Sequence, residues 1–140
     1  MADFEPYLIF DGNCAEAVRF YEKLFGAKIT MIMTNGESPM ADQMPAEAKD
    51  RVLHARLVLN DRALMASDAM LGEKYEGMQN FAVSQYFASL EEGQRVWDAL
   101  AEGGQIRMPF QQTFWSERFG MLADRFGTPW MISAGKPAAM

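Results

Sequence analysis

One sequence pattern occurs twice in the chain, and this repetition limits the folds open to it more than any other feature. A shift of 76 residues superposes the helix cap Asn13 on Ser89, and the buried helix face recurs with it. In the strands that follow, a shift of 66 residues places Met65 on Met131. Matched elements in a matched order are the signature of an internal duplication. We therefore expect two copies of one structural module.

Each copy is predicted to contain a strand, a helix and three further strands. Apolar residues spaced i, i+3, i+4 and i+7 predict the helices, which Asn13 and Ser89 would cap. Tight turns are predicted at 60–61 and at 125–128, where Gly127 can take a positive φ. Residues 34–50 are polar, contain two prolines and predict a long loop. Apolar runs predict strands at 7–10, 28–33, 51–59 and 63–67, and then at 81–87, 105–110 and within 119–133.

These elements predict an α+β fold for a single 140-residue domain. The domain would contain two βαβββ modules, at about 5–68 and about 80–135. The helix of each module covers only one face of its sheet, so the other face must pack against something else. We expect the two modules to form one cupped, mixed β-sheet with the helices outside. Alternating strand residues would then line a partly apolar trough, which is a natural site for a small ligand.

Charge and composition narrow the range of partners. The net charge is −6 and the chain has no run of Lys or Arg, which argues against a nucleic-acid partner. No apolar stretch is long enough to span a membrane, and residues 1–5 do not resemble a signal peptide. The single cysteine excludes an internal disulfide and suits a reducing compartment. We therefore predict a cytoplasmic protein that binds neither nucleic acid nor membrane.

Three stretches resemble the vicinal oxygen chelate superfamily, which contains glyoxalases, bleomycin-resistance proteins and extradiol dioxygenases. They are residues 8–26, 115–120 and 124–130. Within this superfamily the chain is most similar to the PhnB-like branch. The resemblance implies the glyoxalase/bleomycin-resistance fold and a homodimer in which paired modules form the sites. Some relatives carry the description of a ubiquinone methyltransferase, but residues 11–13 are not the glycine-rich turn that a Rossmann-like methyltransferase needs.

The resemblance also indicates where metal ligands would stand. Metal-using members place His, Gln or Glu at the start of a module and Glu on its last strand. On this chain those positions fall on Met65 and Met131 in the last strands, and on Pro6 or Tyr7 and Ala82 or Val83 in the first strands. Thioethers prefer soft metals to hard divalent ions. We therefore predict no metal ligands and no cofactor, and a divalent ion on other residues stays open as an alternative.

The leading functional hypothesis is a metal-independent protein that holds a small amphipathic molecule in the trough. The side chains expected to contact this molecule are Tyr7, Met65, Tyr86, Gln111, Trp115, Arg118 and Met131. A second hypothesis is a lyase, isomerase or dioxygenase-type enzyme that uses His54, with Asp68 just past the same hairpin, as a general base or in a non-standard metal site. A third is a structural or regulatory dimer without a ligand. Cys14, in the first turn of a helix, is interpreted as a buried or unreactive thiol.

Overall fold

A computed structural model describes residues 3–137 of the 140-residue chain. The chain divides between Gly77 and Met78 into two compact units. Each unit contains one of the two predicted modules. Within the described residues, no helix is long and apolar enough to cross a membrane.

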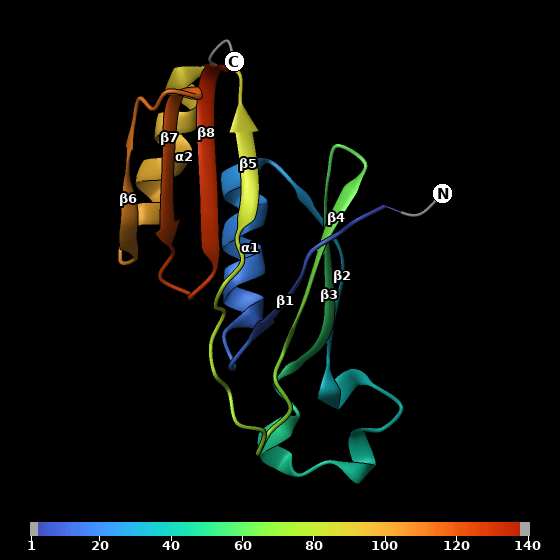
Figure 1. The fold of residues 1–140 in the computed structure, drawn as a ribbon. Helices are drawn as coiled ribbons and strands as arrows, with labels where there is room; N and C mark the ends of the chain where they lie inside the picture. Colours follow the sequence, from blue (N-terminus) through green and yellow to red (C-terminus); the bar gives the residue numbers. More distant parts are fainter. Residues whose placement is uncertain (1–2, 138–140) are drawn as a thin grey trace. The chain divides into compact units, whose positions relative to one another are not determined.

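The first unit is a four-stranded sheet with one helix (Figure 1). Its elements are β1 (Tyr7–Phe10), α1 (Cys14–Phe25), β2 (Lys28–Thr34), β3 (Val52–Leu59) and β4 (Arg62–Asp68). The strand order is β1-β4-β3-β2, with β1 parallel to β4 and the other pairs antiparallel. The predicted loop between β2 and β3 contains three short 3-10 helices, at Asn35–Glu37, Ala41–Gln43 and Ala46–Ala48.

The second unit repeats this topology (Figure 1). Its elements are β5 (Val83–Phe87), α2 (Leu90–Ala101), β6 (Gln105–Gln111), β7 (Ser116–Ala123) and β8 (Pro129–Pro137). The strand order is β5-β8-β7-β6, and the first strand is again parallel to the last. Both helices have 12 residues, and they begin 76 residues apart (90 − 14), as the sequence predicts. The α+β fold with two βαβββ modules is thereby confirmed.

Each helix buries one face against the sheet of its own unit. The buried helical residues are Cys14, Ala17, Val18, Tyr21 and Leu24 in α1, and Gly93, Val96, Trp97 and Leu100 in α2. Trp97 stacks on Phe110 of β6, with the ring centroids 4.9 Å apart. Burial of a large apolar side chain stabilises the fold by about 1.5–3 kcal/mol. Close packing also requires glycine, because a Cβ atom on Gly120 would lie 2.7 Å from the Trp97 ring.

The two helices begin in different ways. Ser89 Oγ accepts a hydrogen bond from the Glu92 N–H at 3.1 Å, which confirms the predicted cap of α2. The Asn13 side chain makes no capping hydrogen bond within the described residues, contrary to prediction. A carboxylate distant in sequence takes its place, because Asp68 Oδ1 accepts from the N–H of Cys14 at 3.0 Å. The first turn of α1 is therefore held by the last residue of β4.

Both predicted hairpin turns are confirmed. Asn60 and Asp61, between β3 and β4, have φ values of 51° and 64°. Gly127, between β7 and β8, has a φ of 94°, and its N–H donates to the Asp124 carbonyl at 2.9 Å. Turn geometry sets the register of a hairpin. The two turns thus set which side chains of β3 and β4, and of β7 and β8, lie side by side.

Candidate functional site

Most of the candidate binding residues lie on the face of each sheet that is opposite the helix of the same unit. In the second unit, Gly120 and Ala134 lie against α2. Side chains alternate between the faces of a strand, so the neighbours of these two residues point away from α2. The register aligns the outward residues in rows across the sheet. We call this set the second open face: Ser84, Tyr86, Met108, Gln111, Phe119, Met121, Met131 and Ser133.

The second open face is rich in thioether and aromatic groups. Met108, Met121 and Met131 form one row across β6, β7 and β8, because Met121 pairs in register with both of the others. Tyr86 is 57% exposed, and its hydroxyl donates to the Gly135 carbonyl at 2.8 Å. None of the side chains that define this face is charged. The face is therefore an apolar surface interrupted by hydroxyl and amide groups.

An aromatic cluster adjoins this face just before β7. The Trp115 ring lies edge-to-face with Phe119, at 5.3 Å between centroids, and with Phe114, at 4.7 Å. Phe114 is 81% exposed. A depression of about 400 Å³ is lined by Gln112, Thr113, Phe114, Ser116, Glu117 and Lys136. Trp115 therefore connects the lining of this depression to the second open face.

The corresponding face of the first unit lies opposite α1 and is more polar. Ala55 and Ala66 pair in register and are buried, so their strand neighbours lie on the other side of the sheet. We call the outward set the first open face: Tyr7, Ile9, Met31, Met33, His54, Arg56, Met65 and Ser67. Unlike the second open face, it carries a guanidinium group and an imidazole.

Tyr7 and His54 form a polar pair on the first open face. The Tyr7 hydroxyl and His54 Nδ1 are 3.1 Å apart, which joins β1 to β3, and the two ring centroids are 5.7 Å apart. Met65 of β4 pairs in register with Tyr7 on one side and with Arg56 on the other. The structure thus brings three of the predicted site residues together. The Tyr7 hydroxyl and His54 Nδ1 can each donate or accept a hydrogen bond, so either group can supply the hydrogen that lies between them.

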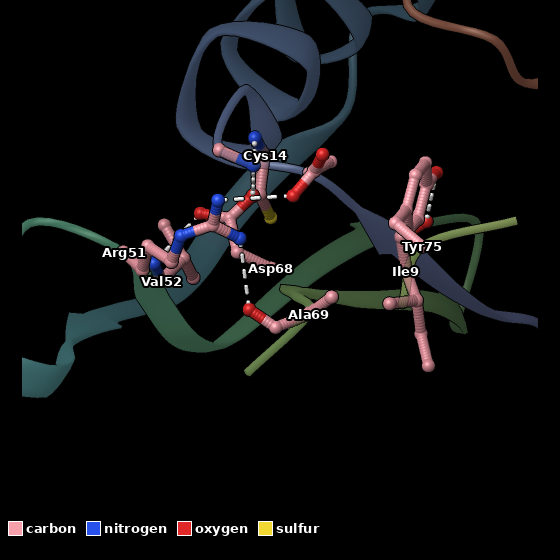
Figure 2. A network of polar contacts seen from close by, with 9 residues as sticks. Ile9, Cys14, Arg51, Val52, Asp68, Ala69 and Tyr75 are labelled. Carbon is pink, nitrogen blue, oxygen red and sulfur yellow. Dashed lines mark hydrogen bonds and ion pairs between the residues drawn. The ribbon is translucent and has the colours of Figure 1, made fainter. Parts of the chain in front are cut away.

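Asp68 is not a partner of His54. It lies two residues after the buried Ala66, on the side of the sheet that faces α1, whereas His54 points to the other side. Figure 2 shows its carboxylate between Cys14 and Val52, and Oδ2 accepts from the Val52 N–H at 2.8 Å. The bound groups are main-chain donors. Asp68 therefore closes the β1–α1 turn onto β3 instead of orienting an imidazole.

Figure 2 shows two further polar contacts in the same part of the first unit. Arg51 donates to the Asp11 carboxylate at 2.9 Å. The Tyr75 hydroxyl donates to the Ile9 carbonyl at 2.7 Å. Burial, followed by the charges of Asp11 and Asp68, raises the pKa of Tyr75. Tyr75 thus connects the segment after β4 to β1, and Arg51 connects the start of β3 to the turn after β1.

Cys14 is buried at the start of α1. Burial, and then the charge of Asp68, raises the pKa of its thiol from 9.0 to about 12. Since the thiolate is the reactive form, we expect iodoacetamide at pH 8.5 to label the native protein at less than about 1% of its rate with the urea-unfolded chain. Mass spectrometry of timed samples measures both rates. Equal rates would show that the thiol is accessible and easily ionised.

The residues at the expected metal positions do not fit a hard divalent ion. Met65 and Met131 are half-buried, one on each open face. The side chains next to Met65 on this face are Tyr7, Arg56 and His54, and His54 carries the single imidazole. Across residues 3–137, no three His, Cys, Asp or Glu side chains are grouped so that they could hold a metal ion. A catalytic zinc site needs about three such ligands.

The predicted ligand-binding residues fall into two groups. On or beside the second open face lie Tyr86, Gln111, Trp115 and Met131, and on the first open face lie Tyr7 and Met65, together with His54. Sequence reasoning missed Phe119 and Met121 of the second open face, and Met33 and Arg56 of the first. Alternation along the strands was the available signal, because each of these residues lies an even number of positions from another residue of its face. The role of every one of these residues toward a ligand remains a prediction.

Arg118 is placed apart from the other predicted residues. Its Nη1 donates to Gln94 Oε1 of α2 at 2.9 Å. Its guanidinium lies over the Phe110 ring, 5.8 Å from the centroid. Arg118 therefore packs between α2 and the sheet, on the side opposite Met131.

The sequence of the chain matches a described family. Residues 2–133 match the family described as 3-demethylubiquinone-9 3-methyltransferase. The chain belongs to this family. Protein YjdN of Escherichia coli (strain K12) is 38% identical over 141 residues, and the alignment covers 94% of each chain.

Solved structures agree with this family assignment. Protein PA1353 from Pseudomonas aeruginosa is 42% identical with a TM-score of 0.89, over 96% of this chain and 98% of that one. The PhnB protein from Bacillus cereus, a putative 3-demethylubiquinone-9 3-methyltransferase by its description, is 26% identical with a TM-score of 0.79. The match covers 96% of this chain and 100% of that one. The fosfomycin resistance protein FosX from Mesorhizobium loti is 12% identical with a TM-score of 0.61, and the match covers 96% of this chain and 92% of that one. At this identity the likeness shows the fold alone. The fold implied by the sequence resemblance is therefore confirmed.

Proposed function

We propose that this protein binds a small amphipathic molecule on the second open face, without a divalent metal ion. The observation that carries the proposal is the row of Met108, Met121 and Met131 on the side of the sheet opposite α2. Met side chains adapt to ligands of different shape, because they are unbranched and polarizable. The same row carries no charge that would have to be desolvated when a ligand binds.

Aromatic and polar groups next to the row support an amphipathic ligand. Phe119 and Trp115 offer ring faces and edges for an apolar, planar portion. Ser133, which pairs with both Tyr86 and Phe119, offers a hydroxyl beside the rings. The depression lined by Lys136 and other residues could accept a polar end of the same molecule. Ligand sites commonly combine such an apolar surface with a few polar groups.

Methyl transfer is not part of this proposal, although the family description names a methyltransferase. A Rossmann-like methyltransferase uses the backbone after its first strand to approach the cofactor closely. In this chain the corresponding N–H groups of Gly12 and Cys14 are bound to the Asp68 carboxylate. The described sheets are also not doubly wound parallel sheets. A quinone-like ring is nevertheless one kind of amphipathic ligand that the second open face would suit.

A neutral fluorescent probe tests the proposal. N-phenyl-1-naphthylamine is an uncharged aromatic molecule that brightens when it leaves water. We expect it to bind the native protein, and Met131→Lys to weaken its affinity at least about tenfold, because an ammonium group would stand in the apolar row. A fluorescence titration measures both affinities, and thermal melts confirm that the variant is folded.

The duplication supplies a matched control. Met65→Lys changes the equivalent position of the first unit, and we expect the probe to bind this variant with unchanged affinity. Equal loss in both variants, or no binding of the probe to the native protein, would contradict the proposal. The homodimer, the cytoplasmic location and catalysis by His54 remain predictions.

A further inference from the structure

We propose that the first open face binds a soft monovalent metal ion, Cu(I) or Ag(I), through the imidazole of His54 and the thioethers of Met33 and Met65. All three residues belong to the first unit. The inference therefore goes beyond the organic ligand proposed for the second open face and does not depend on it.

The strand register places the three donors next to one another. Met33 of β2 stands directly opposite His54 of β3. Met65 of β4 pairs with Arg56, two residues along β3 from His54, so it is a diagonal neighbour of the imidazole. Direct cross-strand partners have Cβ atoms about 4.5–5.5 Å apart, and diagonal partners about 7–8 Å apart. A methionine side chain is long and flexible enough to turn its sulfur toward an ion between such positions.

The Tyr7 hydrogen bond prepares the imidazole for this role. Metal-binding histidines usually use one ring nitrogen for the metal and bond the other to a neighbouring group that orients the ring. His54 Nδ1 is 3.1 Å from the Tyr7 hydroxyl, whereas Nε2 has no hydrogen-bond partner within residues 3–137. When Nδ1–H donates to the Tyr7 oxygen, the lone pair of Nε2 is free. Tyr7 is thus a positioning residue.

The donor chemistry selects the ion. Thioethers are neutral and soft, and they suit Cu(I), whereas hard divalent ions prefer oxygen ligands. The positive charge of Arg56 opposes any cation, but its Nη1 is directed to Thr30 Oγ1 at 3.4 Å, on the β2 side of the face. We therefore expect Arg56→Gln to tighten binding. The second open face has three thioethers in a row without an imidazole, which makes it a comparison site within the same chain.

The single histidine of the chain makes the test specific. The full-length protein, with its methionine methyl groups labelled with ¹³C, is titrated with silver nitrate in chloride-free buffer and followed by NMR. We expect Ag(I) to shift the ring signals of His54 and the methyl signals of Met33 and Met65 at one equivalent. Met33→Leu and Met65→Leu, which keep an apolar side chain of similar size, should each weaken Ag(I) binding about tenfold by calorimetry. Cu(I), supplied anaerobically in competition with a coloured chelator, should bind the native protein and the variants in the same order of affinity.

Matched variants separate this site from general silver binding. Met131→Leu should leave the affinity unchanged, and Tyr7→Phe should lower it while His54 still shifts. Unmoved His54 signals, equal affinities of the Met33→Leu, Met65→Leu and native proteins, or tighter binding of Zn²⁺ than of Ag(I) would each overturn the proposal.

Discussion

Asp68→Ala is expected to lower the free energy of unfolding by about 4 kcal/mol, because three main-chain N–H groups lose their acceptor at once. The Asp68 carboxylate binds the N–H groups of Gly12, Cys14 and Val52 at 2.8–3.0 Å. It therefore joins the start of α1 to the start of β3. A small domain has only about 5–15 kcal/mol of stability in total, so this loss would be a large fraction of it. Urea denaturation followed by circular dichroism measures the change.

Asp11→Ala is the matched control for this variant. Asp11 is a carboxylate of the same corner, but it is half-exposed and binds the Arg51 side chain. Exposed ion pairs contribute about 0–1 kcal/mol, so the control should be nearly as stable as the native protein. If Asp68→Ala cost no more than Asp11→Ala, the Asp68 contacts would not hold the first unit together.

Asp124→Ala is expected to cost a similar amount, about 4 kcal/mol, in the second unit. Asp124 is buried in the turn between β7 and β8. Its Oδ1 accepts from the N–H groups of Phe126 and Thr128 at 2.9 and 3.0 Å, and its Oδ2 accepts from the Trp130 indole N–H at 2.9 Å. The variant leaves these buried donors without their acceptor. Thermal unfolding followed by tryptophan fluorescence measures the loss.

Asp98→Ala, on the exposed side of α2, serves as the control for this second variant. The Asp98 carboxylate accepts one hydrogen bond from Gln94 at the surface. Surface substitutions of this kind usually change stability by no more than about 0.5 kcal/mol. A melting temperature of Asp124→Ala equal to that of Asp98→Ala would show that the turn is stable without its carboxylate.

Local patterns predicted most of the fold. Helical periodicity predicts both helices, since this signal acts over a few residues. The turn residues Asn60 and Asp61 lie where the β3–β4 hairpin reverses, and Gly127 lies in the β7–β8 turn. The duplication added the order of the elements along the chain, because both copies repeat one succession of strand, helix and three strands.

Contacts between residues distant in sequence could not be predicted in the same way. Asn13 has the residue type of a helix cap, yet Asp68, 54 residues from Cys14, binds the first turn of α1. Which strand residues share a face depends on register, and a shift by one residue exchanges the faces. The sequence therefore predicts Arg118 beside Met131, whereas the structure packs it against α2.

Strand register also explains where the candidate site residues lie. The chemistry of their side chains makes Trp115 and Tyr86 candidates, and the register places Tyr86 on the second open face and Trp115 beside it. His54 is the single histidine of the sequence, but its neighbour is Tyr7 and not a carboxylate. Residue type indicates some of the candidates and the family resemblance indicates Met65 and Met131, whereas the strand pairing determines their partners.

The position of the bound probe tests the central proposal most directly. N-phenyl-1-naphthylamine is added to the protein labelled at its methionine methyl groups, and Met→Leu variants assign the signals. We expect the methyl signals of Met108, Met121 and Met131 to shift as the probe saturates, while those of Met31, Met33 and Met65 stay unchanged. Shifts confined to Met31, Met33 and Met65, or no methionine shift despite bound probe, would contradict binding on the second open face.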